Sequence, residues 1–239
     1  MPGPLQLLEF DSEVFGFPVY RIADPDHRAL PNALNRAAAH GRFAVDAKVD
    51  AGHMKQIARL ERLRLRRICT QVTLVNDHLQ VTTPQPDPQV VMSDFLKFDP
   101  KTVAAHAERF TFARFFQDHR LPRAGVRRHM ARWIENSLSG RFKVASIGHN
   151  FCTFGLAGDE LAIDLLSCLD ARQGIATRLL HSLAKSAAAT GAKRIRVTTE
   201  AENLGAVRLY LSCGFFPVRS TVCMHRVDGP AASEPDDTA

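Results

Sequence analysis

The sequence is poor in the features that several classes of site require. Its five cysteines are odd in number and none forms a C-x-x-C pair, which argues against a metal site or a disulfide framework and favours a reducing cytoplasm. No apolar stretch approaches the roughly 20 residues of a membrane span, so no membrane partner is expected. Met1 leads into Pro2-Gly3-Pro4 rather than a basic segment and an apolar run, so no signal peptide is predicted.

Two common phosphate-binding motifs are also missing. The sequence contains neither G-x-G-x-x-G nor a Gly-Lys-Ser/Thr after a glycine-rich loop, which excludes the dinucleotide and nucleoside-triphosphate fingerprints. The net charge is +6, with one dense basic run at 59–67. Because Leu60, Leu63 and Leu65 recur there at helical spacing, the run is interpreted as a solvated helix face, and no nucleic-acid partner is expected. A modest positive field suits an anionic substrate.

Hydrophobic periodicity predicts a smaller α/β region followed by a larger one. In the first region, strands over 19–22, 43–49 and 68–75 alternate with helices over 30–40 and 53–64, after a turn at 11–17. Closely spaced prolines predict a linker over 84–89, which separates residues 1–83 from a domain over 90–227. The tail over 228–239 has almost nothing to bury and is expected to be disordered.

The second region carries its own strands and helices. Strand, helix and hairpin patterns are predicted at 90–95, 103–116, 124–138 and 142–156. The phenylalanines within 103–116 are interpreted as core residues. Both regions therefore belong to the α/β class.

One stretch, residues 161–178, joins a buried strand to a helix through a turn of small residues around Gly174. Such a junction aims free backbone N–H groups and the positive end of the helix dipole at one point, which suits phosphate. A side chain at Gly174 or Ala176 would hold a pyrophosphate away from these groups. Considered alone, the junction fits an ordinary tight turn without a ligand as well as it fits a phosphate site.

A second element follows about thirty residues later. Asn203 is suited to cap a helix at its start, and Gly214 is suited to end it in the left-handed conformation. Seven residues separate Asn203 from Tyr210, close to two helical turns, so both residues can share one helix face.

The turn together with N-x-x-A-x-x-L-Y-x-x-x-G-F resembles the GNAT superfamily of acetyl-CoA-dependent N-acetyltransferases. The resemblance implies a GNAT fold, with a central twisted mixed sheet flanked by helices. It also implies that Asn203 contacts the cofactor arm and that Tyr210 protonates the departing thiolate. Strand N–H groups near Leu166 would hold the thioester carbonyl. The residues expected to bind acetyl-CoA are Leu166, Ser167, Cys168, Arg172, Gln173, Gly174, Ile175, Ala176, Thr177 and Asn203.

Further motifs resemble the TDP-fucosamine N-acetyltransferase branch. These are L-x-F-D-S-x-x-F-G-x-x-V-x-R-I at 8–22, Ala113-Arg114-Phe115, Trp133-Ile134-Glu135-Asn136, and Leu165-Leu166-Ser167 leading into Asp170-Ala171-Arg172. The resemblance implies acetylation of a nucleotide-linked amino sugar for surface polysaccharide. The N-terminal region would contribute to the acceptor site, and domains would pair across a homodimer. The sequence departs from that branch at one position, where Leu209 precedes Tyr210 and the branch has a basic residue. The identity of the sugar nucleotide is therefore left undetermined. The residues expected to contact the sugar nucleotide are Arg114, Phe115 and Asp118.

The chemistry leaves several alternatives open. Tyr210 suits the acid because a phenol, with a reference pKa of about 10, stays protonated at neutral pH. The base is open among Asp118, His119, Asp164, Glu200, Glu202 and a water chain. Covalent chemistry at Cys168 is disfavoured because no His/Cys pairing is readable. Alternative functions are acetylation of a protein or other small-molecule amine, and a catalytically silent acyl-CoA-binding module.

Overall fold

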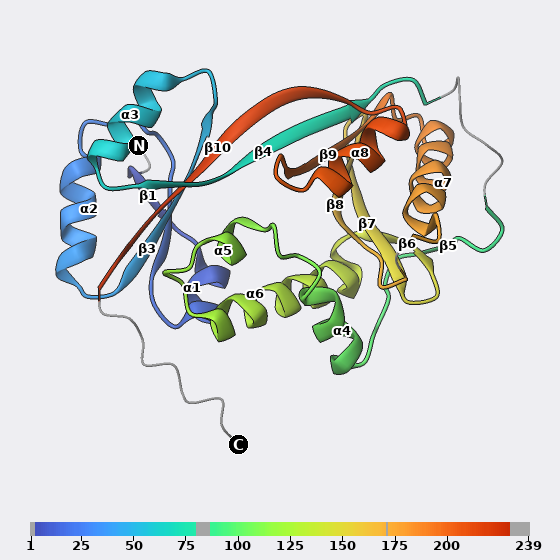
Figure 1. Cartoon of the computed structure of the whole chain (residues 1–239), viewed down its shortest axis with the longest axis horizontal. Helices are drawn as coiled ribbons and strands as arrows, with labels where there is room; N and C mark the ends of the chain where they lie inside the picture. The colour runs from blue at the N-terminus through green and yellow to red at the C-terminus, as the bar shows by residue number, and fades with distance from the viewer. Residues whose placement is uncertain (1–2, 80–86, 171, 230–239) are drawn as a thin grey trace. The chain divides into compact units, whose positions relative to one another are not determined.

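The computed structural model describes residues 3–79, 87–170 and 172–229 (Figure 1). The chain forms two compact units, each assembled from separate segments. The first unit comprises residues 1–71, 111–129 and 220–239, and the second comprises residues 72–110 and 130–219. This grouping differs from the predicted division at 84–89, because strand β4 (Arg66–Asn76), helix α6 (Arg123–Asn136) and strand β10 (Phe216–Asp228) each contribute residues to both units. Residues 80–83 of the predicted first region, 84–86 of the predicted linker and 230–239 of the predicted tail lie outside the described residues.

The first unit is built on strands in the order β1-β2-β3-β10. β2 pairs with β3 in parallel, whereas β10 pairs with β3 in antiparallel register from Thr221–Asp50 to Asp228–Phe43. Its buried core joins both helices α2 and α3 to β3, through side chains such as Leu34, Leu60 and Val45. The elements that contribute to it are β1 Leu5–Leu7, α1 Glu9–Phe15, β2 Val19–Ile22, α2 Leu30–Ala39, β3 Phe43–Asp50, α3 Met54–Arg62, β4 Arg66–Asn76, α5 Arg114–Gln117, α6 Arg123–Asn136 and β10 Phe216–Asp228.

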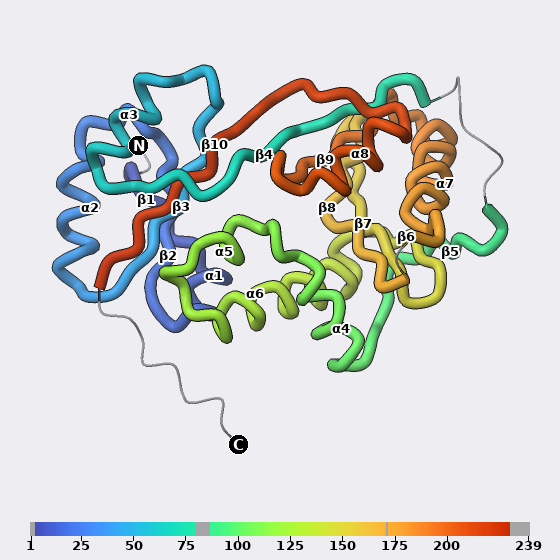
Figure 2. Tube along the Cα trace, in the orientation of Figure 1, coloured from blue at the N-terminus to red at the C-terminus, as the bar shows by residue number. Residues whose placement is uncertain are grey.

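The second unit contains the order β9-β8-β7-β6-β5, with β4 beside β9. Strands β5 to β8 pair antiparallel, and β8 pairs with β9 in parallel. Helix α7 lies against the strands of this unit (Figure 2) and contacts β6, β7, β8 and β9. It buries Leu179, Leu180 and Leu183 in the core of this unit. Its remaining elements are β5 Val91–Ser93, α4 Pro100–Ala107, a π-helical turn Ser137–Arg141, β6 Lys143–Ile147, β7 Asn150–Ala157, β8 Glu160–Ser167, α7 Ile175–Ala189, β9 Arg194–Glu200 and α8 Leu204–Ser212.

Most predicted elements are confirmed to within a few residues, but two differ. The predicted turn at 11–17 is largely helix α1, which ends at Gly16 with a φ of 76°. The predicted helix over 103–116 is two shorter helices. Asp99 accepts hydrogen bonds from the N–H groups of Lys101 and Thr102, so α4 begins earlier, at Pro100, and it ends by Glu108. The capping residues Asp99 and Pro100 set the start of α4, and apolar spacing alone does not detect them.

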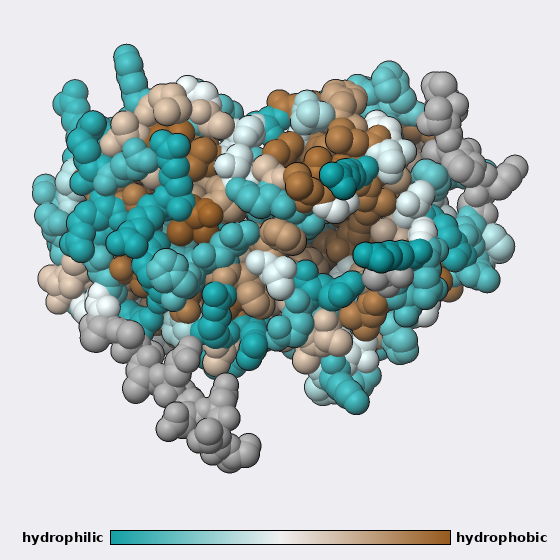
Figure 3. Space-filling view, viewed as in Figure 1, coloured by the Kyte–Doolittle hydropathy of each residue, from teal (hydrophilic) through white to brown (hydrophobic). Residues whose placement is uncertain are grey.

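The surface of the second unit includes exposed apolar side chains on α8 and the start of β10, and Figure 3 shows brown side chains gathered over this region. Leu204 and Leu211 lie two turns apart on one face of α8, and Phe216 and Val218 follow on β10. Within the described residues, no helix is long and apolar enough to cross a membrane.

Candidate functional site

The site begins where β8 and β9 separate. Their parallel pairing covers Glu160–Arg194, Leu161–Ile195 and Ala162–Arg196. Beyond these pairs, β8 continues to Ser167 and β9 to Glu200. In the described part of the chain, the facing edges of the two strands therefore stop bonding to each other after Ala162. An opening of this kind leaves backbone N–H groups of β8 available to a ligand.

A β-bulge controls which way the end of β8 faces. Leu165 pairs with Thr153 and Ile163 with Phe154, so Asp164 is an extra residue in β8. A bulge reverses the alternation of side chains after it. Accordingly, Leu166 packs against the α7 core, whereas Asp164 on the other face accepts a 2.6 Å hydrogen bond from the Ser137 hydroxyl. Burial raises the pKa of Asp164.

The turn after β8 is shaped to receive an anion. Arg172 and Gly174 both have left-handed φ angles, of 63° and 72°, and a Cβ added at Gly174 would meet nothing within 4 Å. The space in front of the turn is therefore open. The Arg178 N–H donates to the Gly174 carbonyl at 3.1 Å, which is the first hydrogen bond of α7. The N–H groups that precede Arg178 lie in the first turn of the helix, where backbone N–H groups have no acceptor within the helix.

Asn150 fixes the beginning of this turn from the neighbouring hairpin. Its side-chain N–H group donates to an Asp170 carboxylate oxygen at 2.9 Å, and its side-chain oxygen accepts from the Asp170 N–H at 3.2 Å. These two bonds fix Asp170 against Asn150 and occupy one of its carboxylate oxygens. The turn then presents Arg172, Gln173 and Gly174, all exposed, with no acidic side chain among them.

Helix α8 places Asn203, at its start, and Tyr210 in the second unit, which also contains the turn after β8. The Asn203 side-chain oxygen accepts from the Ala206 N–H at 3.2 Å, which confirms its expected role as a helix cap. Tyr210 is buried in the core cluster against which Leu166 of β8 and Cys168, just after β8, pack. Its pKa is raised by burial, so the phenol keeps its proton at neutral pH and can serve as an acid. The turn after α8 lies beside the start of α7, where Thr177 hydrogen-bonds the Cys213 thiol.

A Ser–His pair that the sequence did not reveal lies at the end of β8. The His106 Nδ1 atom lies 2.7 Å from the Ser167 hydroxyl oxygen, and His106 Nε2 lies 2.8 Å from the His149 carbonyl oxygen. Both side chains are buried. Burial lowers the pKa of His106, so its ring is neutral. Sequence spacing gives no signal for this pair, because 61 residues separate its members.

The cysteines of this unit do not resemble nucleophiles. Burial, and then the Asp170 charge, raise the pKa of Cys168 to about 11, so its thiol stays protonated at neutral pH. The described cysteines are all free. Within the described ranges, no group of three or more His, Cys, Asp or Glu side chains is arranged to hold a metal ion.

The residues expected to contact a sugar nucleotide belong to the first unit. Arg114 faces Asp46, with 3.4 Å between Nε and Oδ1, and its side chain is 13% exposed. Phe115 is buried among Phe15 and Val126. Asp118 is only 1% exposed. Burial opposes its ionisation, but hydrogen bonds from His225 and Arg120 hold its pKa below the ordinary range. Arg114 is thus the most accessible of the three predicted residues.

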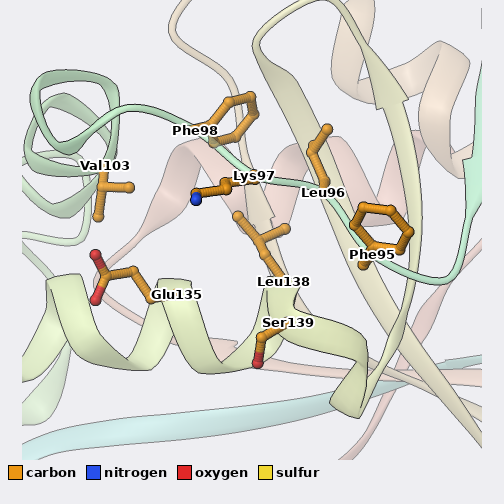
Figure 4. A pocket seen from close by; sticks show the side chains of 8 residues that line it. All are labelled: Phe95, Leu96, Lys97, Phe98, Val103, Glu135, Leu138 and Ser139. Carbon is orange, nitrogen blue, oxygen red and sulfur yellow. The ribbon is translucent and has the colours of Figure 1, made fainter.

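A cavity of about 410 Å³ opens beside α4 in the second unit. Phe95 to Phe98 lie along one wall, across from Glu135, Leu138 and Ser139 (Figure 4). Its lining is mainly apolar, with Lys97 and Glu135 as the charged groups. The cavity borders the Ser–His pair through Phe98, whose ring stacks on His106 with centroids 5.4 Å apart.

Comparison with known proteins agrees with this geometry. The model of the acetyltransferase (GNAT) family matches residues 170–215, which span the turn at Arg172 and Gly174, Asn203 and Tyr210. This segment of the chain therefore resembles the GNAT acetyltransferase family. A relative from Bacillus subtilis, the spore coat polysaccharide biosynthesis protein SpsD, is 31% identical over 133 residues, which cover 52% of this chain and 46% of SpsD. The chain therefore matches about half the length of this curated relative.

Solved GNAT structures share the fold at low sequence identity. A GCN5-related N-acetyltransferase from Sphaerobacter thermophilus is 15% identical with a TM-score of 0.57, covering 90% of this chain and 74% of its own. A GCN5-related N-acetyltransferase from Kribbella flavida is 15% identical with a TM-score of 0.56, and the match covers 94% of this chain and 87% of the Kribbella chain. A tandem GNAT protein from the clavulanic acid biosynthesis pathway is 13% identical with a TM-score of 0.54, and the match covers 91% of this chain and 77% of the tandem protein's chain. These likenesses confirm the predicted mixed α/β fold.

Proposed function

We propose that this protein transfers an acetyl group from acetyl-CoA to an amine, by direct attack of the amine on the thioester. The observation that carries the proposal is the opening between β8 and β9, which leads into an exposed turn of left-handed residues at Arg172 and Gly174. Backbone N–H groups at this turn suit the coenzyme A pyrophosphate, because they combine with the positive end of the α7 dipole.

The second half of the proposed chemistry rests on Tyr210. Its burial against the cluster that includes Cys168, together with its raised pKa, keeps a neutral phenol near the end of β8. We propose that the phenol gives its proton to the departing thiolate. The protonated state of Cys168 counts against an acyl-cysteine intermediate.

For the acceptor we propose the amino group of a nucleotide-linked amino sugar, of the TDP-4-amino-4,6-dideoxyhexose type. Two features support this choice. SpsD, the relative at 31% identity, is described as a spore coat polysaccharide biosynthesis protein. The first unit also carries two of the motifs that resemble the sugar-nucleotide branch, at 8–22 and 113–115, and the second of these includes the partly exposed cation Arg114.

The test is coenzyme A release from acetyl-CoA with a panel of dTDP- and UDP-linked amino sugars, with peptide amines and an acceptor-free control alongside. Fast release with one amino sugar is the expected result. Release with a peptide or another small amine would keep the acetyltransferase and replace its acceptor. Tight acetyl-CoA binding with no accelerated release would favour a silent acyl-CoA-binding module instead.

A further inference from the structure

We propose that Ser167 and His106 form a proton relay, which takes the proton that the attacking amine nitrogen loses as its bond to the thioester carbon forms. This inference rests on the proposed acetyl transfer and supplies the base that the sequence left open.

The hydrogen bonds define the direction of the relay. The His149 carbonyl oxygen can only accept, so His106 Nε2 carries a proton and donates to it over 2.8 Å. In a neutral ring Nδ1 is then the acceptor, and the Ser167 hydroxyl donates to it over 2.7 Å. The hydroxyl proton is thus already aimed at a nitrogen that can receive it, and the hydroxyl oxygen keeps lone pairs for an incoming N–H.

The surroundings of His106 hold the ring in one position. Phe98 stacks on it, and the edge of Phe151 meets it with centroids 4.8 Å apart. Burial is the largest effect and lowers the pKa of His106. The hydrogen bond to the His149 carbonyl opposes it, and the charges of the His149 ring and Arg109 act with it, so the net shift is downward. A ring held neutral in this way is ready to accept a proton during the reaction rather than before it.

The place of Ser167 on β8 connects the pair to the reaction. Ser167 is the last residue of the strand, beyond the point where β8 and β9 part. If N–H groups near Leu166 hold the thioester carbonyl, the attacking nitrogen approaches within about 3.5 Å of that carbon, close to the end of β8. The bulge at Asp164 turns the Ser167 side chain to the face that carries His106.

The step balances as follows. The N–C bond forms and the C–S bond breaks, while the amine N–H passes to Ser167 Oγ and the Ser167 hydroxyl proton passes to His106 Nδ1. Tyr210 protonates the thiolate. Afterwards the imidazolium releases a proton to solvent and the phenolate regains one, so each turnover yields the amide and the free thiol with the enzyme unchanged.

Two measurements test the relay. The first needs no acceptor: nitrogen NMR of the histidine-labelled full chain should show His106 as the neutral Nε2–H tautomer at pH 7, with its Nδ1 signal shifting in S167A. An Nδ1–H tautomer, or an Nδ1 signal indifferent to S167A, would overturn the proposal whatever the acceptor is.

The second measurement is kcat against pH with acetyl-CoA and a dTDP-4-amino-4,6-dideoxyhexose. His106→Asn keeps an acceptor oxygen for the Ser167 hydroxyl but has no basic nitrogen. We expect kcat to fall about 100-fold, with an unchanged acetyl-CoA Kd and a rate that keeps rising with pH. S167A should lower kcat similarly, Ser167→Thr should retain activity, and the control His181→Ala on α7 should match the parent.

Full kcat with an unchanged pH profile in H106N would overturn the relay and leave the acetyltransferase intact. A wild-type protein that acetylates none of the panel amines would instead remove the proposed function, and the relay with it.

Discussion

The two units contain matching β-α-β segments that differ in what they can bind. In β3-α3-β4 and in β9-α8-β10, three residues join the first strand to a nine-residue helix and three more lead to the next strand. The starts of the helix and the last strand, Met54 and Arg66, recur 150 positions later at Leu204 and Phe216. Even the bond that closes each helix recurs, from Leu65 N–H to Leu60 O and from Phe215 N–H to Tyr210 O, both 3.0 Å.

The preceding segments also match in outline. β2 leads through seven residues to α2, and β8 leads through seven residues to α7. However, β2 ends at Ile22, directly after its three pairs with β3, whereas five residues of β8 extend beyond its three pairs with β9. Only the second unit therefore opens its parallel strand pair.

The turns differ in charge and in free donors. In the first unit the Asp26 N–H bonds to the Asp24 carboxylate and the Ala29 N–H to the His27 ring, while Pro31 has no N–H at all. Carboxylates and occupied donors do not suit a phosphate. The two turns thus follow a similar backbone path, but only the turn of the second unit has the exposed residues and open donors that suit an anion.

The largest expected effect is at Tyr210, whose counterpart in the first unit is Leu60. Tyr210→Phe should lower kcat about 100-fold, because it removes the proposed acid and keeps the packed ring. Acetyl-CoA Kd, measured by calorimetry, should stay within about twofold. Since the phenol acts while protonated and burial raises its pKa, wild-type kcat should show no loss from this group up to pH 10. Leu60→Met is the matched control, and an unchanged kcat in Y210F would discard the acid role.

The second-largest expected effect is on acetyl-CoA affinity, at Gly174. This glycine is one difference between the turn before α7 and the turn before α2 in the first unit. Gly174→Val puts a branched side chain at a φ of 72° and in front of the N–H groups. We expect acetyl-CoA Kd to rise at least about tenfold, corresponding to about 1.4 kcal/mol. Ala29→Val, at the matching place before α2, should leave Kd unchanged. Wild-type affinity in G174V would mean that the turn does not hold the cofactor.

A smaller effect is expected at the helix caps. Asn203→Ala removes the side-chain bond to the Ala206 N–H and should cost about 1 kcal/mol of unfolding free energy. His53, at the same place before α3, makes no side-chain cap bond, so His53→Ala should cost much less. Urea unfolding of both variants measures the difference. Equal losses would contradict the assignment of the Asn203 side chain as a cap.

Sequence patterns predicted most of the strands, the turn at Gly174 and the α8 caps, because these depend on local apolar spacing and local backbone needs. They could not predict that β3 pairs with β10, more than 170 residues away in the chain, and so missed the discontinuous units. The Ser167–His106 pair was missed for the same reason: it depends on where α4 meets β8. The resemblance to the sugar-nucleotide branch predicted Asp118 as an acceptor contact, but it could not predict that Asp118 is buried against Arg120 and His225, which come from different parts of the chain.

The smallest expected effect is at the left-handed residue that follows each helix. Gly214 adopts a φ of 82° and Arg64 a φ of 70°. An L side chain in this region costs roughly 1 kcal/mol, partly offset by the extra unfolded-state freedom of glycine. Arg64→Gly should therefore raise the unfolding free energy by about 0.5 kcal/mol, despite losing an exposed contact with Asp228.

Gly214→Ala should lower the unfolding free energy, and the added Cβ would also meet the Asn76 side chain at 3.4 Å. Opposite signs in urea unfolding would support equivalence of the two positions, whereas destabilisation by both changes would show that Arg64 makes contacts outweighing its backbone strain.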